Sequence, residues 1–386
     1  MPGQRRPFIY LDHNATTPVD PEVVNAMMPY LREEFGNPSS GYLLGQRAKA
    51  GLETARGAVA DLLGCQAREV VFTSGGSESN NMVLKGLIDF KRPENFHIIT
   101  SAVEHPAVLN PALFLMELGV KVTVVPVDHG CRVDPESIQK VISPKTTLIS
   151  IMLANNETGT LQPIPEISRI AKAHGVPFHT DAAQGVGKIG VDVNSLGVDF
   201  LTVAAHKLYG PKGIGALFIR NGQRLTPLIH GAAQERGTRP GTENTILSAG
   251  LGAACRIAGK RLKNDSQNME TLRNRLQTLL FQNLDDIVLN GHPQERLPNT
   301  LNVSIPGIEG ARILDGLPDI MASTGAACHD RSVKLSHVLS AMKVPPKIGM
   351  GALRFSLGRH NTPEQIEAAA ESIIHAVKRI RNGRKK

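Results

Sequence analysis

The sequence predicts an α/β fold, with a large domain built on a mostly parallel sheet and a smaller α+β domain at the C-terminal end. Two observations predict this class. In the first part of the chain, apolar runs of strand length alternate with stretches of helical periodicity, which is typical of parallel sheets. From about residue 242 the alternation stops, because a helical stretch extends to about residue 280 and short strands then mix with helices.

The elements of the large domain follow one another in a regular order. Helical patterns cover residues 21–35 and 44–63, and an expected strand at 69–73 leads into a helix at 77–90. Further strands are expected at residues 97–100, 120–127, 147–153, 177–180, 201–204 and 214–219. Further helices are expected at residues 106–118, 135–141 and 165–174. Ligands of such sheets gather at the carboxyl ends of the strands, so polar residues that directly follow strands are the first candidates for a site.

The smaller domain is expected to combine residues from both ends of the chain. Its C-terminal part contains short strands and a final helix, at residues 287–289, 301–305, 353–357 and 363–381. A chain of 386 residues with 41% hydrophobic content is long enough for two domains, each with its own core. We expect the large domain to span residues 15–260 and the small domain to contain residues 1–14 and 261–386.

Composition and charge argue against several classes of function. No apolar run approaches the length of a membrane span, and the first residues lack the apolar segment of a secretory signal, so we expect a cytoplasmic protein. Cys65, Cys131, Cys255 and Cys328 form no CxxC pair, which predicts neither a disulfide framework nor a metal site. Six of the basic residues behind the net charge of +8 lie in the last nine positions, where no aromatic residue is interleaved. We therefore expect no nucleic-acid binding.

Lys207 is the first candidate for catalysis. It lies between the expected strands at 201–204 and 214–219, close to the core. Burial of a lysine lowers its pKa and makes it an amine nucleophile, the kind of group that forms a Schiff base with an aldehyde cofactor. For a lysine considered alone, a strand-end position from which the side chain reaches solvent is the alternative.

Four segments that follow expected strands carry polar residues suited to such a cofactor. Residues 73–80 place glycines and hydroxyls before a helix N-terminus, where free N–H groups bind phosphate. Asp181 follows another strand, and its carboxylate can hold a protonated pyridine nitrogen through a charge-assisted hydrogen bond. His105 and Asn155 follow two more. Each segment alone has an ordinary explanation as a cap or a turn, but together they favour a site.

Several motifs give the chain a resemblance to a known family; they lie at residues 10–18, 101–105, 155–159, 181–184, 206–207 and 239–244. In these motifs, and in their order over nearly the whole chain, it resembles the class V aminotransferase-like family, in the branch of cysteine desulfurases and selenocysteine lyases. The resemblance implies a fold type I enzyme that depends on pyridoxal 5'-phosphate (PLP) and works as a homodimer. It also implies cysteine or selenocysteine as the substrate and the transfer of sulfur or selenium to an acceptor protein.

The resemblance also implies roles for individual residues. Lys207 would form the Schiff base and move the α-proton of the substrate, and His105 would stack on the cofactor ring. Cys328, in a run of small residues expected to form a mobile loop, would accept the sulfur as a thiolate. The other expected contacts to the cofactor, with Thr242 coming from the second subunit, are Gly76, Ser77, Asn155, Asp181, Gln184 and His206. The expected contacts to the substrate are Arg354, Asn14 and Asn155.

The sequence leaves more than one reaction open. The first expectation is a cysteine desulfurase that converts L-cysteine to L-alanine and leaves a persulfide on Cys328. The alternative is a selenocysteine lyase, because Ala204 stands where desulfurases usually have a serine, and because residues 325–329 look closer to the cysteine loop of the lyases. Another PLP enzyme, such as an aminotransferase, would share Lys207 and Asp181 but would have no use for Cys328.

Overall fold

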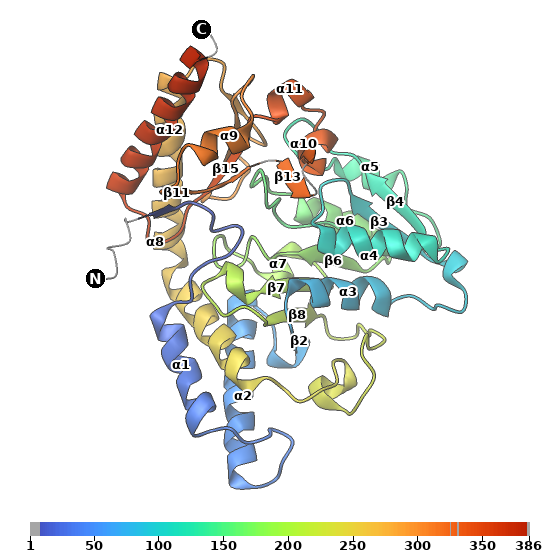
Figure 1. Ribbon diagram of the computed structural model, residues 1–386. Coiled ribbons are helices and arrows are strands. Elements are labelled where there is room, and N and C mark those ends of the chain that lie inside the picture. Colours follow the sequence, from blue (N-terminus) through green and yellow to red (C-terminus); the bar gives the residue numbers. More distant parts are fainter. Residues whose placement is uncertain (1–7, 325, 330–331, 384–386) are drawn as a thin grey trace.

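A seven-stranded sheet forms the centre of the large domain in the computed structural model, which describes residues 8–324, 326–329 and 332–383 (Figure 1). The strand order is β2-β8-β7-β6-β5-β3-β4. Only β8 runs antiparallel to its neighbours within this sheet, so the predicted α/β class with a mostly parallel sheet is confirmed. The bounds are β2 Val70–Thr73, β3 His97–Ser101, β4 Lys121–Val125, β5 Thr146–Ser150, β6 Phe178–Asp181, β7 Phe200–Ala204 and β8 Gly215–Ile219.

Helices cover both faces of this sheet because successive strand residues point to opposite sides. The helices α3 (Gly76–Gly86) and α4 (Pro106–Glu117) pack on the face that carries Val71, Ile98 and Phe200. The neighbouring residues Val70, Phe72 and Ile99 belong to the core on the other face. That core is covered by α2 (Leu43–Leu63), α6 (Ile164–Ala173) and the first half of α8 (Thr245–Asn283), and the remaining helices of this domain are α1 (Pro21–Arg32), α5 (Pro135–Gln139) and α7 (Val193–Leu196).

The small domain is built on a four-stranded antiparallel sheet in the order β12-β15-β10-β9. Its strands are β9 Val288–Leu289, β10 Thr300–Ser304, β12 Ser323–Thr324 and β15 Ala352–Ser356. Beside it, β1 (Ile9–Tyr10) pairs in parallel with β11 (Ile320–Met321), and β13 (Ala326–His329) forms a hairpin with β14 (Ser332–Leu335). The helices are α9 (Gly310–Asp315), α10 (His337–Ala341), α11 (Pro346–Gly349) and α12 (Pro363–Gly383).

Helix α8 joins the two domains along its 39 residues. Leu251 and Ala258 in its first half belong to the core of the large domain, whereas Leu272 and Leu280 belong to the core of the small one. Leu11 packs in that second core. Val338 and Leu339 of α10 nevertheless pack in the core of the large domain, so the apolar contacts do not divide at a single position of the chain. The expected boundaries, with residues 1–14 and 261–386 forming the small domain, stay a prediction. In the part of the chain that the structure describes, no helix combines the length and the apolarity that a membrane crossing requires.

Candidate active site

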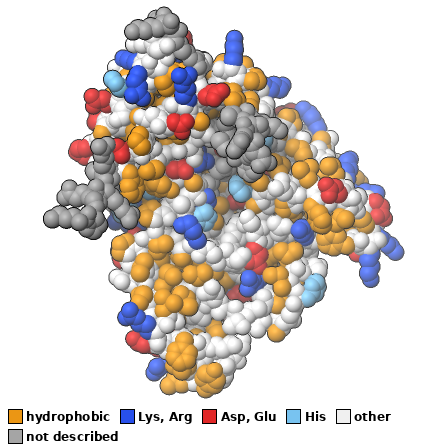
Figure 2. Space-filling model, viewed as in Figure 1, with side chains coloured by type: hydrophobic (Ala, Val, Ile, Leu, Met, Phe, Trp, Pro, Cys, Tyr) orange, Lys and Arg blue, Asp and Glu red, His pale blue; other side chains and the backbone are white. Residues whose placement is uncertain are grey.

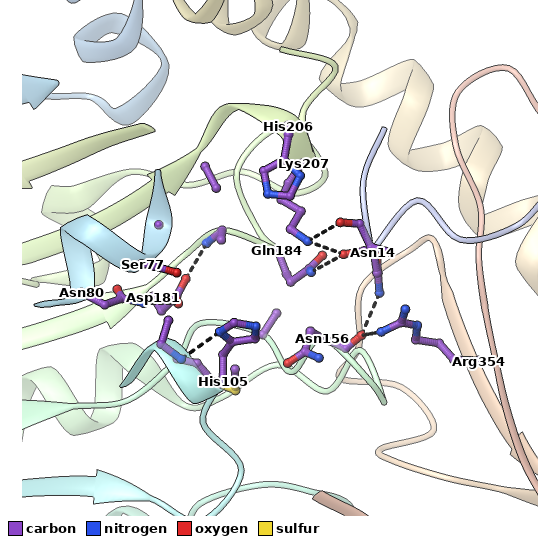
Figure 3. A pocket seen from close by; sticks show the side chains of 17 residues that line it. Asn14, Ser77, Asn80, His105, Asn156, Asp181, Gln184, His206, Lys207 and Arg354 are labelled. Carbon is purple, nitrogen blue, oxygen red and sulfur yellow. Dashed lines mark hydrogen bonds between the residues drawn. The ribbon is translucent and has the colours of Figure 1, made fainter. Parts of the chain in front are cut away.

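A cavity of about 410 Å³ lies where the carboxyl ends of the parallel strands face the small domain (Figure 3). Figure 2 shows basic and histidine side chains around the hollow in the middle of the molecule's surface in this view. Residues expected from the sequence that line this cavity are Asn14, Gly76, Ser77, His105, Asp181, Gln184, His206, Lys207 and Arg354. They come from distant parts of the chain, so the fold brings together a set that the sequence only suggested.

Lys207 ends a short 3₁₀ turn (Ala205–Lys207) that directly follows β7. Its Nζ donates to the backbone carbonyl oxygens of Asn14 and Ala15, both at 2.7 Å. Burial, reinforced by the positive charge of Arg354, lowers the pKa of Lys207 to about 8, while Asp181 acts in the opposite direction. A lysine in this state is partly neutral near physiological pH, as a nucleophile or a base requires.

Asp181 ends β6 and holds its carboxylate at the cavity wall with 8% of its surface exposed. Oδ2 accepts a hydrogen bond from Nδ2 of Asn80 at 2.7 Å, and Oδ1 accepts one from the backbone N–H of Ala183 at 3.0 Å. Oδ1 of Asn80 is buried and has no partner among the described residues. Two donors thus fix the carboxylate, and its remaining lone pairs are free for a donor in the cavity.

The N-terminus of α3 forms the end of the cavity near Gly76 and Ser77. Gly75 precedes the helix at φ 151° and ψ −178°, a conformation that essentially only glycine adopts, and it supplies no side-chain cap. The first N–H groups of α3 therefore remain available to an anion, and the helix dipole favours negative charge there. Ala204 offers only a methyl group to this end of the cavity.

Two histidines border the same cavity in the neutral form. Burial, with a contribution from Lys207, lowers the pKa of His206 to about 4, and its Nδ1 lies 3.2 Å from Oγ1 of Thr16. His105 caps α4, where its Nδ1 accepts from the backbone N–H of Ala107 at 3.1 Å. Burial also lowers the pKa of His105. Its neutral ring must then carry the proton on Nε2, and the cap fixes the orientation of the ring.

Arg354 of β15 reaches the cavity from the small domain. Its Nη1 donates to the carbonyl oxygen of Asn156 at 3.0 Å, and its Nη2 donates to Oδ1 of Asp12 at 2.7 Å and to Oγ of Ser323 at 3.0 Å. The side chain is thus already oriented by three acceptors. A substrate carboxylate would share this guanidinium with Asp12 or replace it.

Of the expected site residues whose side chains the structure describes, Asn155 and Thr242 do not line this cavity. Asn155 is fully buried in its own turn, where its Nδ2 donates to the carbonyl of Val103 and its Oδ1 accepts from the backbone N–H groups of Glu157 and Thr158. Thr242 is exposed in a separate depression. The backbone of Cys328 pairs within the β13–β14 hairpin rather than in an irregular loop, and its side chain lies outside the described part of the structure.

Sequence reasoning missed three residues of this region. Asn156, rather than its neighbour Asn155, lines the cavity, and the sequence holds no signal that distinguishes the two. Asn80 lies at the end of the segment 73–80, one helical turn after Gly76 on α3, but that motif gave no reason to expect its contact with Asp181. Lys188 is buried behind Gln184 and contacts it. Its position four residues after Gln184 was the only feature of the sequence that linked Lys188 to the site.

The comparison with known families agrees with this geometry. The family model described as Aminotransferase class-V matches residues 9–369. The chain belongs to this family. It is 46% identical over 376 residues to the cysteine desulfurase IscS of Methanosarcina thermophila, which covers 97% of this chain and 93% of that protein. Human cysteine desulfurase is 42% identical over 376 residues, covering 97% of this chain and 82% of that protein.

Solved structures of other proteins have the same fold. A NifS-like protein matches with a TM-score of 0.90 at 38% identity, covering 96% of this chain and 99% of that one. The structure described as SspA in complex with cysteine matches with a TM-score of 0.81 at 36% identity, covering 92% of this chain and 100% of that one. The family and the fold expected from the sequence are therefore confirmed. No metal-binding group of three or more His, Cys, Asp or Glu side chains occurs among the residues described.

Burial lowers the pKa of Lys207 and the charge of Arg354 lowers it further; the second effect can be tested in protein without cofactor. Replacing Arg354 by Gln should raise the pKa of Lys207, and replacing Asp181 by Asn should lower it, each by roughly one pH unit. The measurement is the pH dependence of labelling of Lys207 by an amine-specific reagent. Arg275→Gln, at an exposed arginine on the surface, is the matched control. A pH profile that Arg354→Gln leaves unchanged would contradict this electrostatic coupling.

Proposed function

We propose that this chain is a PLP-dependent cysteine desulfurase, which converts L-cysteine to L-alanine and leaves a persulfide on Cys328. One observation carries the proposal: a lysine with a lowered pKa, a buried carboxylate and an uncapped helix N-terminus face one cavity. Proteins named cysteine desulfurase that are 42–46% identical over nearly the full length support the choice of substrate.

The residues around the cavity fit PLP. Lys207 supplies an amine for the aldehyde group, and Asp181 supplies a carboxylate for the ring nitrogen. The free N–H groups of α3, together with Ser77 and His206, supply donors for the phosphate. The ring of His105, fixed by its cap on α4, offers a flat surface for stacking. When bound, PLP provides an electron sink that stabilises negative charge at the α-carbon of an amino acid.

The protein residues then have separate tasks in the reaction. Arg354 binds the carboxylate of the substrate and so orients its α-carbon in the cavity. Lys207 removes the α-proton as a base, which its lowered pKa permits near neutral pH. Asp181 would hold the ring nitrogen of PLP in its protonated, electron-withdrawing form.

Cys328 accepts the sulfur in this proposal. Its thiolate bonds to the sulfur of the substrate, and the bond between that sulfur and the β-carbon breaks. One proton is added to the β-carbon and one is returned to the α-carbon, which gives alanine. Cysteine and one thiol thus become alanine and one persulfide, with no outside oxidant or reductant. The other cysteines are unsuited to this task, because burial raises the pKa of the thiols of Cys65, Cys131 and Cys255 to about 12.

Selenocysteine lyase activity is the second candidate, and Ala204 is the observation that favours it. The methyl group of Ala204 lines the cavity where the resemblance leads one to expect a phosphate-binding hydroxyl in a desulfurase. Another PLP reaction, such as amino transfer, fits less well because it gives no role to Cys328.

Replacement of Cys328 tests the proposed reaction directly. Cys328→Ala should reduce alanine formation from cysteine at least about a hundredfold, because a cysteine thiol with a reference pKa of about 8.5 leaves poorly without a nucleophile to take its sulfur. Alanine formation from selenocysteine should survive in part, since a selenol leaves more readily. Cys65→Ala is the matched control. Undiminished turnover of cysteine by Cys328→Ala would exclude Cys328 as the acceptor, and wild-type turnover of selenocysteine alone would move the function to the lyase.

We further propose a homodimer in which Thr242 completes the phosphate site of the partner. Thr242 is exposed and lies outside the cavity of its own subunit, and the loop before it is held by Arg239, whose Nε donates to Oε1 of Glu78 on α3 at 2.9 Å. Exposed apolar side chains between the end of α1 and the start of α2, seen at the bottom of Figure 2, offer surface to a second copy. They include Leu31, Phe35, Tyr42 and Leu43, which are 55–70% exposed.

Hybrid dimers test this arrangement. Lys207→Ala and Thr242→Ala chains should each be inactive or nearly so, yet mixing and refolding them together should restore partial activity, because one hybrid site then contains both groups. A catalytically competent monomer in sedimentation experiments would contradict the proposal. An acceptor protein for the sulfur and a cytoplasmic location remain predictions, which affinity capture of the persulfide form and cell fractionation would test.

A further inference from the structure

Lys188 is a second buried lysine next to the cavity, and the reaction described above gives it no task. Only 5% of its surface is exposed. Its Nζ donates to Oε1 of Gln184 at 2.7 Å and to Oδ1 of Asn14 at 3.0 Å. None of the ion pairs between described residues includes Lys188. A buried lysine that meets two amide oxygens and no carboxylate is unusual, because burial of an amine without a counter-ion is costly.

The contact from Lys188 decides which way the amide of Gln184 faces. An amide presents an oxygen acceptor on one side and an NH₂ donor on the other, and a lysine N–H can only bond to the oxygen. With Oε1 held by Lys188, Nε2 must lie on the opposite side, where it donates to the backbone carbonyl of Asn14 at 3.0 Å. Gln184 lines the cavity, so its donor side is the one available there (Figure 3).

The amide of Asn14 is fixed in the same way. Its Oδ1 accepts from Lys188 and from Nδ2 of Asn299, both at 3.0 Å. Its own Nδ2 is thereby left to donate to Oγ1 of Thr300 at 2.9 Å and to the carbonyl of Asn156 at 3.2 Å. The backbone carbonyl of Asn14 in turn accepts from Lys207. Lys188 thus reaches the proposed catalytic lysine through one amide side chain and one carbonyl group.

We infer that Lys188 is a positioning residue, which holds Gln184 with its amide N–H toward the cavity so that bound PLP meets a donor there. This inference rests on the proposed function. Without Lys188, Oε1 of Gln184 would be buried with no donor, and the side chain would gain a partner only by turning that oxygen toward the cavity or toward water.

The role does not require Lys188 to be charged. Burial, together with the positive charges of Lys207 and Arg354, lowers the pKa of Lys188 well below its usual value. A neutral amine still has two N–H groups, which matches its two acceptors Gln184 and Asn14. Its lone pair does not reverse the amide of Gln184, because Oε1 would then face the carbonyl of Asn14 that accepts from Nε2. The neutral form also adds no further positive charge to a cavity that already contains Lys207 and Arg354.

Replacement of Lys188 by Met, which has similar length but no donor, tests the inference. In protein stripped of cofactor, Lys188→Met should bind PLP about tenfold more weakly, the cost of one misdirected hydrogen bond. The absorption band of the bound cofactor should shift as well, because the donor facing it changes. Lys140→Met, at a lysine whose side chain is 70% exposed, is the matched control and should bind PLP like the wild type.

A double replacement separates positioning from general support of the fold. Gln184→Leu should weaken PLP binding by itself, and adding Lys188→Met to it should cause no further loss, because the residue through which Lys188 acts is already gone. Losses that multiply in the double variant, or wild-type binding and spectrum in Lys188→Met, would overturn the inference while leaving the proposed function intact. Failure of the wild type to bind PLP would overturn both.

If Lys188→Met does not fold, Gln184→Glu tests the donor through which Lys188 is inferred to act. The new carboxylate can pair with Lys188, so the fold should be retained, but the donor toward the cavity is lost. Gln184→Glu should then show a loss of PLP affinity of about tenfold, as one missing hydrogen bond predicts. Unchanged affinity in this variant would show that no donor from Gln184 is needed.

Discussion

The hydrogen bonds of Asn14 are the interaction on which the rest of the site depends. Asn14 is 1% exposed, and its side chain and backbone join the N-terminal segment to both domains. Its partners are Asn156, Gln184, Lys188, Lys207, Asn299, Thr300 and Ser356. Because one residue satisfies donors from both domains, the gap between them has a fixed width at this point. The positions of Lys207, on the large domain, and Arg354, on the small domain, are thereby fixed relative to each other.

Electrostatics then determines what this gap can bind. Lys207 and Arg354 bring positive charge to the cavity, and the N-terminus of α3 adds its partial positive charge, whereas Asp181 and Asp12 carry the opposing negative charge. The acidic side chains are both held by donors from the protein. An anionic cofactor and an amino-acid carboxylate are therefore complementary to the cavity. Burial, together with the positive charge of Arg354, keeps the amine of Lys207 partly neutral.

The sequence predicted the parts of this site that lie directly after strands, because strand ends are recognisable and parallel strands end at one edge. Asp181, His105 and Lys207 were found in this way, as was the helix N-terminus at Gly76. Contacts that depend on the conformation of a turn could not be predicted. Asn155 and Asn156 look alike in the sequence, yet the conformation of the turn buries Asn155 and places Asn156 at the cavity. Lys188 was missed because a buried lysine is recognised only when its burial is known.

The most direct test of the central claim is to locate the sulfur after one turnover. The holoenzyme is mixed with one equivalent of L-cysteine without reductant, and the alanine formed is quantified. The protein is then digested, and the masses of the cysteine-containing peptides are measured by mass spectrometry. We predict one additional sulfur atom on the peptide that contains Cys328, in proportion to the alanine formed. Alanine without added sulfur on that peptide, or sulfur on Cys65, Cys131 or Cys255 instead, would contradict the proposed reaction.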